Sequence, residues 1–470
     1  MAAFSCFRRT QNEWLTVDFL LCSTLMFLVE FGCAVLGAPS PRLLEIAVCR
    51  DYYSHQKGRI SAKDCKIQEV QVQLGFMLTV LTTCSIFAAT VMQIPMGLLA
   101  DNRGRRVALL LNITSTILFW GWIPFVVIFT NLPISALYIA PIFVLIGGGP
   151  WASGILIYAA INRRVTSSQR TPAFSIMEAI SGIADLLGPA LGAVTMEHHI
   201  WLPFLLAILS FTAMYIPTLL LEDETVNSST EINSVHSEGL DCRSTNTEEQ
   251  PLLHEGSTSG YSQGHEMVAP IRSTGFIYGI TFASFFLISL ARDSINFLIP
   301  WISWRFNESM ARAGLVFSLR AVVSSFVFFV LLPFVSSFVV AGAGAETKPR
   351  DLFISVSSAV LLCVGSLVIA ISSSISILIA GFCIMTLGSG ATITLRAFLA
   401  SRVDRSFSGR IFAVISATST IGSLLGMPLM GALYSMNISS ETGDVSLPFA
   451  AAAGAYFLVL CITGLLQFTS

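Results

Sequence analysis

Long apolar runs alternate with short polar gaps along almost the whole chain. Each run is roughly 20 residues long, so a helix rising about 1.5 Å per residue would cross a hydrocarbon core of about 30 Å. Backbone N–H and C=O groups in lipid must form hydrogen bonds with one another, because no water is available there. Helices are therefore the expected structure. We predict about twelve spans from this pattern. They are residues 15–38, 74–99, 106–130, 134–161, 172–196, 200–221, 272–300, 311–338, 351–372, 374–400, 409–435 and 447–468.

Composition agrees with this pattern. The chain is 54% hydrophobic and 11% charged, and its mean hydropathy is +0.75. The net charge of −2 comes without a basic stripe, so no nucleic-acid partner is expected. The sequence therefore predicts an all-α integral membrane protein whose surroundings are the lipid bilayer.

One tract divides the predicted spans into six and six. Residues 222–270 are rich in Ser, Thr and Glu and too polar to bury a core, so we expect a disordered cytosolic linker. It separates an N-terminal half, 15–221, from a C-terminal half, 271–470, with a cytosolic N-terminus at 1–14. "RTPAFSIMEAISGIADLLGPALGAV" and "GRIFAVISATSTIGSLLGMPLMGAL" occupy corresponding places in the two halves. This faint repeat is typical of transporters built from parallel six-helix units.

Basic residues in the short connections set the predicted orientation. They fall on one side of the membrane, which the positive-inside rule makes cytosolic, and both termini lie on that side. The sequons at Asn307 and Asn437 fall on the opposite side, where glycosylation is expected. The basic residues are Arg8, Arg9, Arg103, Arg105, Arg106, Arg163, Arg164, Arg170, Lys348, Arg350, Arg402, Arg405 and Arg410.

Two cysteines fall in the first predicted outer loop, residues 39–73. An oxidising compartment favours a disulfide between Cys49 and Cys65, which would add about 3 kcal/mol of loop constraint. The alternative is two independent free thiols. Most other cysteines lie within predicted spans, where small buried residues are the expected interpretation.

Charge is concentrated in the connection between the second and third spans, "GLLADNRGRRVAL". This stretch resembles the signature loop of the major facilitator superfamily. The resemblance implies a fold of twelve helices in two six-helix halves. It also implies a charge relay against a neighbouring helix end, which stabilises the outward-facing state and breaks as the halves rock. The residues at the signature positions are Gly97, Asp101, Gly104, Arg105 and Arg106.

A narrower resemblance covers the first outer loop. "APSPRLLEIAVCRDYY" and "KDCKIQEVQVQL" resemble fungal members of that superfamily related to proton-coupled folate and heme-carrier transporters. Such transporters use a carboxylate in helix 5 and an arginine in helix 10. The resemblance therefore implies Glu178 and Arg396 as counterparts.

Charged residues inside the spans are costly, so each is a candidate for proton or substrate binding. Glu178 and Asp185 are seven residues apart and share one helix face. Asp185 and Arg320 are both expected near mid-membrane, where they could pair. Glu30 and Arg396 complete the candidates. Glu178 is the favoured proton carrier because a partly desolvated carboxylate has a raised pKa and can take up and release a proton as access alternates. The alternative for all five is a structural ion pair that locks the bundle.

These features predict a secondary transporter that exports a small organic solute, coupled to protons and monomeric, with no cofactor and no metal. Uptake of an organic anion is the alternative direction. A membrane-embedded enzyme and a non-transporting sensor are the alternative classes, although no nucleophile–base constellation, metal spacing or phosphate loop is present. The expected location is the plasma membrane or, alternatively, the vacuolar membrane. Arg292 is expected near the outer edge, where its side chain would snorkel.

Overall fold

The computed structural model describes residues 17–54, 64–130, 132–164, 170–221, 271–326, 347–400, 408–440 and 445–469. Every regular element in these ranges is helical. The predicted N-terminus 1–14 and the predicted linker 222–270 lie outside the described residues, so both stay predictions.

The N-terminal half contains nine described α-helices and three short elements of other helix types. They are α2 (Val17–Val35), α3 (Pro39–Tyr52), η1 (Asp64–Lys66), α4 (Gln68–Asn102), α5 (Arg105–Pro124), η2 (Phe125–Phe129), η3 (Ile134–Ile139), α6 (Ala140–Gly147), α7 (Gly149–Arg164), α8 (Arg170–His198), α9 (Leu202–Ala213) and α10 (Tyr215–Leu220).

The C-terminal half is built in the same manner. Its described elements are α12 (Ile271–Arg292), η4 (Asp293–Phe297), α13 (Leu298–Arg305), α14 (Met310–Phe326), α16 (Thr347–Ala370), α17 (Ile375–Leu387), η6 (Gly388–Gly390), α18 (Ala391–Ala400), α19 (Ser408–Ser439) and α20 (Leu447–Thr469).

The helices confirm the predicted fold class. Among the described residues, 11 helical segments are long and apolar enough to cross a membrane. The predicted span 311–338 is represented by α14, which the structure describes as far as Phe326. The helical run through 134–161 is interrupted between α6 and α7, where Gly148 (φ 80°) and Gly149 (φ 57°) adopt left-handed backbone that glycine tolerates best.

One prediction about the loops is wrong in part. Residues 39–73 were expected to be an outer loop, but residues 39–52 of that stretch form α3. Pro39 and Pro41 are suited to the first helical turn because the backbone N–H groups there have no partner within the helix. The helix is polar in sequence, yet its Glu45 is fully buried by neighbouring elements.

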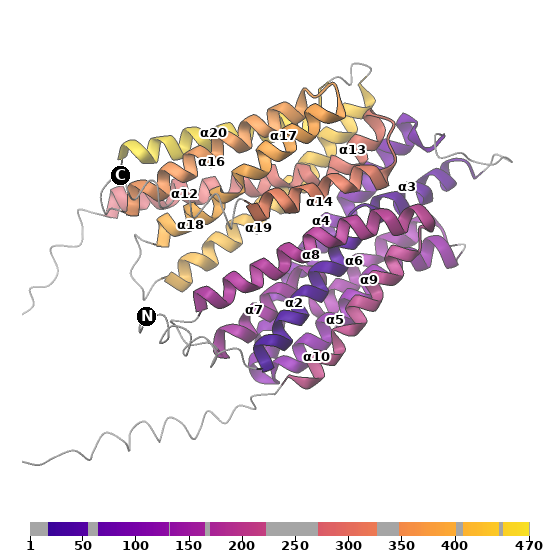
Figure 1. The fold of residues 1–470 in the computed structure, drawn as a ribbon, viewed down its shortest axis with the longest axis horizontal. Coiled ribbons are helices and arrows are strands. Elements are labelled where there is room, and N and C mark those ends of the chain that lie inside the picture. Colours follow the sequence, from indigo (N-terminus) through magenta and orange to yellow (C-terminus); the bar gives the residue numbers. More distant parts are fainter. Residues whose placement is uncertain are drawn as a thin grey trace, which may run out of the picture.

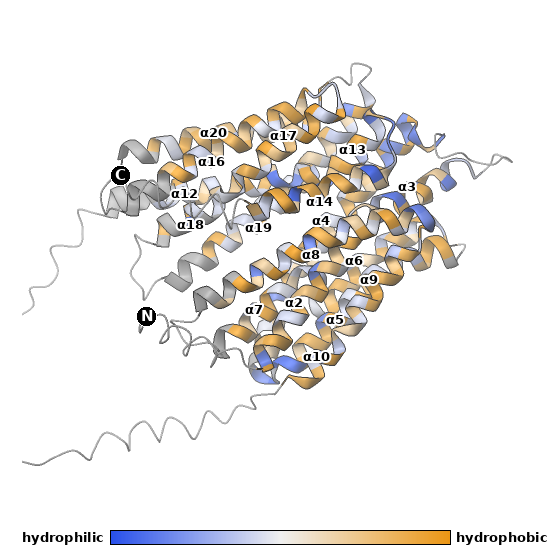
Figure 2. Cartoon of the chain, viewed as in Figure 1, coloured by the Kyte–Doolittle hydropathy of each residue, from blue (hydrophilic) through white to orange (hydrophobic). Residues whose placement is uncertain are grey.

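The two halves lie side by side (Figure 1) and meet along two pairs of helices, α4 with α19 and α8 with α14. The start of α2 and the end of α20 lie at the same end of the bundle, which we call the termini end. Helices α3 and α13 lie at the opposite end, the α3 end. Apolar residues dominate the long helices, and hydrophilic residues gather around the α3 end (Figure 2). This distribution fits a bundle that lipid surrounds.

Candidate functional site

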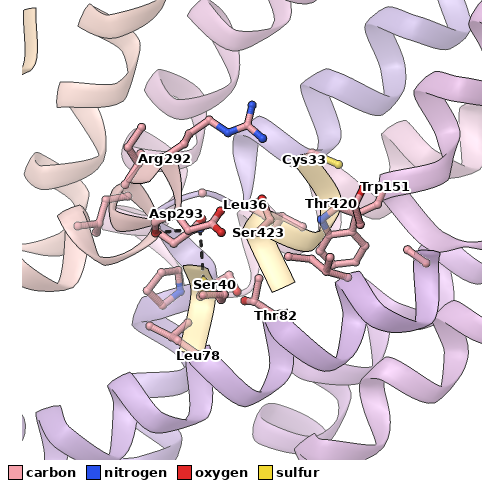
Figure 3. Close-up of a pocket in the computed structure, with 18 of the residues that line it drawn as sticks. Cys33, Leu36, Ser40, Leu78, Thr82, Trp151, Arg292, Asp293, Thr420 and Ser423 are labelled. Atoms are coloured by element: carbon pink, nitrogen blue, oxygen red, sulfur yellow. Dashed lines mark hydrogen bonds between the residues drawn. The ribbon is translucent and has the colours of Figure 1, made fainter. Parts of the chain in front are cut away.

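A cavity of about 610 Å³ lies between the two halves (Figure 3). This size is within the range of small-molecule binding sites. Elements that border it include α2, α4, α5 and α7 of the N-terminal half and α12, η4, α14 and α19 of the C-terminal half. The polar and aromatic lining residues are Cys33, Ser40, Thr82, Thr90, Gln93, Trp120, Trp151, Arg292, Asp293, Asn296, Phe317, Arg320, Ser419, Thr420 and Ser423.

The two walls of this cavity differ in charge. The lining residues from the N-terminal half are all uncharged, and they include the indole rings of Trp120 and Trp151. The C-terminal half contributes the charged lining residues Arg292, Asp293 and Arg320. A neutral, partly aromatic wall therefore faces a charged one.

Asp293 is held where α12 ends and the 3-10 turn η4 begins. Asp293 is 7% exposed, and the Ser423 side chain lies near its carboxylate. Its carboxylate oxygen Oδ2 is buried and has no hydrogen-bond partner within the part of the chain that the structure describes. A Cβ atom at Gly426 would lie 2.8 Å from this oxygen, so glycine at that position leaves room for the carboxylate.

Arg292 and Arg320 border the same cavity without a protein partner. Among the described residues, neither guanidinium makes a hydrogen bond or an ion pair. The Arg292 side chain extends away from that of Asp293 (Figure 3). The expectation that Arg292 snorkels at the outer edge is therefore wrong, because the residue faces the central cavity.

The cavity is closed at the α3 end by close contacts between the halves. Gly75 of α4 lies against the ring of Tyr434 of α19, and a Cβ at Gly75 would be 2.5 Å from Tyr434 Cδ1. Lys66 Nζ donates hydrogen bonds to the carbonyl oxygens of Ser303 and Glu308. These contacts bring the N-terminal and C-terminal halves together on that side.

Asp185 and Arg320 lie near each other but do not pair. Both line a smaller cavity of about 120 Å³, yet these two described residues form no ion pair. The predicted ion pair is therefore not formed in this conformation, although both side chains face the same small cavity. Arg320 borders both cavities and is the one residue of the five predicted intramembrane candidates that lines the central cavity.

The other predicted candidates lie outside the lining of the central cavity. Glu178 Oε1 accepts a hydrogen bond of 2.8 Å from the Tyr158 hydroxyl. The Arg396 guanidinium lies 5.9 Å from the ring centroid of Phe285. Glu178 and Arg396, both described, form no ion pair with each other. Glu30 lies close enough to Glu178 and Asp185 for the three carboxylates to repel one another when charged.

The signature loop joins helices of the N-terminal half. Gly104 directly precedes α5 and has a φ of 93°, a conformation that favours glycine. Arg105 Nη1 donates to the carbonyl of Ala160, 3.2 Å away near the end of α7. Arg106 Nη2 donates to the carbonyl of Leu221, 2.9 Å away beyond the end of α10. Cations at helix C-termini are favoured by the helix dipole.

The signature loop also includes Gly97 and Asp101. Gly97 lines a small cavity of about 220 Å³, and a Cβ there would meet no atom within 4 Å. Asp101 belongs to the last turn of α4, but its side chain lies outside the described residues. The charge relay therefore stays a prediction.

The α3 end carries the predicted disulfide and sequons. Cys49 of α3 and Cys65 of η1 are joined by a disulfide. Asn307 is exposed and adopts a φ of 52° after α13. Asn437 is only 1% exposed, and its Oδ1 accepts a hydrogen bond of 2.9 Å from the backbone N–H of Leu447. A glycan on Asn437 would have to fill that buried space, so the structure contradicts glycosylation there.

A helical membrane bundle of two similar halves around a central polar cavity is the architecture of a secondary transporter. The sequence model described as the Major Facilitator Superfamily matches residues 62–345. The chain belongs to this superfamily, as the signature loop predicted, and it is a transporter rather than an enzyme.

Relatives and solved structures agree with this assignment. The chain is 27% identical over 448 residues to the MFS efflux pump atnC of Emericella nidulans, covering 93% of this chain and 85% of that protein. It is 25% identical over 417 residues to the efflux pump ustT of Aspergillus flavus, covering 87% of this chain and 80% of that protein. The crystal structure of a D-xylose-proton symporter has the same fold, with a TM-score of 0.61 at 13% identity, covering 96% of this chain and 95% of that one.

Proposed function

We propose that the protein is a secondary active exporter that moves a small organic solute in exchange for protons. The observation that carries the proposal is the central cavity, which lies between two halves, holds ionisable residues and is closed at the α3 end. Such a cavity serves alternating access when the halves rock around it. The names of the relatives atnC and ustT, both described as efflux pumps, support the outward direction.

Glu178 is the proposed proton carrier. Glu178 is exposed, forms no ion pair with another described residue, and accepts a hydrogen bond from Tyr158. A proton taken up on one side and released on the other would complete each cycle. The protein is proposed to act as a monomer in the plasma membrane with both termini in the cytosol, or alternatively in the vacuolar membrane.

The opposite direction, proton-coupled uptake of an organic anion, rests on the folate and heme-carrier resemblance of the α3 segment. A deletion strain separates the two directions. Loss of an exporter should raise the amount of its solute retained in the cells and lower the amount excreted, whereas loss of an importer should do the reverse for a supplied solute.

A test on the purified protein uses reconstituted vesicles with an imposed pH gradient. A solute identified in the deletion strain should move against its own gradient when protons flow the other way. Movement in the same direction as protons would overturn exchange in favour of uptake. No movement in vesicles that contain the folded protein would favour a sensor.

A further inference from the structure

Charged residues are distributed unevenly around the central cavity. All of its charged lining residues come from the C-terminal half: two arginines and one aspartate. Unpaired charge at membrane depth is costly, so residues of this kind usually face a ligand, an ion or one another. Here the described guanidinium groups of Arg292 and Arg320 have no hydrogen-bond or ion-pair partner in the protein.

Asp293 does not neutralise these arginines by direct contact. Asp293 is only 7% exposed, whereas Arg292 is exposed on the cavity wall. Oδ2 of Asp293 has no hydrogen-bond partner among the described residues. Asp185 lines the smaller cavity but not the central one, and these two described residues form no ion pair. A molecule in the central cavity therefore faces the guanidinium groups of Arg292 and Arg320, which have no direct partner among the described residues, whereas Asp293 is mostly buried.

The opposite wall offers flat apolar surface. Trp151 is 37% exposed and lines the cavity. Its ring is held edge-on by Phe119, with centroids 5.4 Å apart and an interplanar angle of 70°. Trp120 borders the same wall. Aromatic rings fixed in this way present a rigid surface to a second ring.

We propose that the central cavity binds organic acids that join a carboxylate or sulfonate to an aromatic body. Arg292 and Arg320 hold the acid group, and Trp120 and Trp151 contact the ring. Planar guanidinium groups are suited to this task because they bind carboxylates through two parallel hydrogen bonds. The assignment rests on the proposed export function. Exchange of an anion outward for a proton inward is favoured by a negative-inside membrane potential.

The test compares three probes that share one ring system: naphthoate, naphthamide and naphthylmethylammonium. Their dissociation constants are measured by titration calorimetry on the purified full-length protein. Naphthoate should bind about tenfold or more tighter than naphthamide, because a hydrogen bond to a charged group is replaced by one to a neutral amide. Arg320→Gln should reduce this preference and should weaken naphthoate binding more than naphthamide binding, because it removes one of the two guanidinium groups while Arg292 remains.

Arg312→Gln is the matched control. Arg312 lies on the same helix, its side chain is 70% exposed, and its ion pair with Glu308 stays within the C-terminal half. This variant should keep the preference for the acid. Trp151→Leu should weaken naphthoate and naphthamide alike, because both lose the same ring contact.

Three results would overturn the proposal: equal binding of acid and amide, tightest binding of the ammonium probe, or no binding of any probe. The same probes in vesicles with a pH gradient separate this proposal from the export function. Driven movement of the ammonium probe alone would overturn the substrate class and leave export intact. Tight naphthoate binding without driven movement would support the site and overturn proton-driven export.

Discussion

Lys66 in the N-terminal half and Ser303 in the C-terminal half are joined by a hydrogen bond of 2.8 Å, from the lysine Nζ to the backbone carbonyl. A second bond of 2.7 Å runs from the same nitrogen to the carbonyl of Glu308, across the turn between α13 and α14. Lys66 directly follows Cys65, whose disulfide with Cys49 fixes η1 to α3. The lysine is therefore anchored on one half and hydrogen-bonded to the other.

Lys66→Met should weaken closure at the α3 end, because methionine cannot donate to the two carbonyls. Cys33 lines the central cavity and serves as a reporter in a variant that retains only Cys33, Cys49 and Cys65. In vesicles of known orientation, an impermeant thiol reagent added at the α3 end should label Cys33 about tenfold faster after the substitution.

Arg312→Met is the control for that experiment. It also removes a positive charge near Glu308, but its ion pair lies within the C-terminal half. Its labelling rate should equal that of the parent. If Lys66→Met labels no faster than Arg312→Met, the lysine does not hold the halves together.

The closure of the two halves at the α3 end should depend on pH through the ionisation of Lys66. Burial lowers the pKa of Lys66; the carboxylates of Glu45 and Glu308 oppose this shift, and Arg42 adds to it. In a state open at the α3 end the amine is hydrated and its pKa returns toward the ordinary lysine value. The closed state then binds fewer protons between the two pKa values, so raising the pH through that range favours closure.

The measurement is again the labelling of Cys33 from the α3 end, now at increasing pH. The ratio of the parent rate to the Lys66→Met rate should fall as the pH rises, because ionisation of the Cys33 thiol is common to both and cancels. A ratio that is constant or that rises with pH would contradict this assignment.

The disulfide gives a third prediction. Cys49 and Cys65 are 16 residues apart in sequence, and a loop of this length implies about 3 kcal/mol of stabilisation. Both should resist thiol reagents added outside intact cells until a reductant is present. Reduction should also speed Cys33 labelling from that side, because Lys66 loses its anchor. Ready labelling of both cysteines without reduction would show that they do not form a disulfide.

Much of the fold follows from the sequence because membrane spans are a matter of length and hydropathy. The buried α3 does not, because Arg42 and Glu45 make the segment polar. Glu45 pairs with Arg42 on its own helix, and its Oε1 also accepts a hydrogen bond of 2.7 Å from Gln71 Nε2 of α4, which is a tertiary contact. Sequence spacing cannot show such a contact.

The site was predicted less completely for a related reason. Arg292 and Asp293 are visible in the sequence as two adjacent charges in an apolar span, and that signal could have found them. Depth counting along a continuous helix placed Arg292 near the outer edge, but the chain changes from α12 to the 3-10 turn η4 at this point. Arg320 was found because it lies inside an uninterrupted helix, where position along the sequence does indicate depth.

The signature loop provides a fourth prediction. Asp101→Asn should impair transport strongly while the protein remains folded and in the membrane, because its carboxylate is expected to act in a charge relay that changes with conformation. Arg106→Gln should instead lower the free energy of unfolding by about 1–2 kcal/mol, because it removes hydrogen bonds to the carbonyls at the end of α10. Wild-type transport by Asp101→Asn would show that the loop only marks the membrane boundary.

The last prediction concerns Glu178 and the coupling of transport to protons. Glu178→Gln keeps the shape of the side chain and its ability to accept from Tyr158, but it fixes the neutral form. Transport driven by a pH gradient should fail, because no proton can be released to complete the cycle. Exchange of substrate across the membrane without a gradient should continue, since it needs only rocking with substrate bound.

A purely structural role for Glu178 predicts a different result, in which Gln lowers stability and both modes of transport decline together. Tyr158→Phe is the matched variant, because it removes the 2.8 Å hydrogen bond and leaves the carboxylate able to titrate. It should retain driven transport and shift its pH profile, whereas Glu178→Gln should have no driven transport at any pH. Both modes are measured in vesicles at matched protein amounts. Undiminished proton-driven transport in Glu178→Gln would exclude this carboxylate as the carrier. The same test would then be applied to Asp185 and Glu30, which are close enough to interact with it electrostatically.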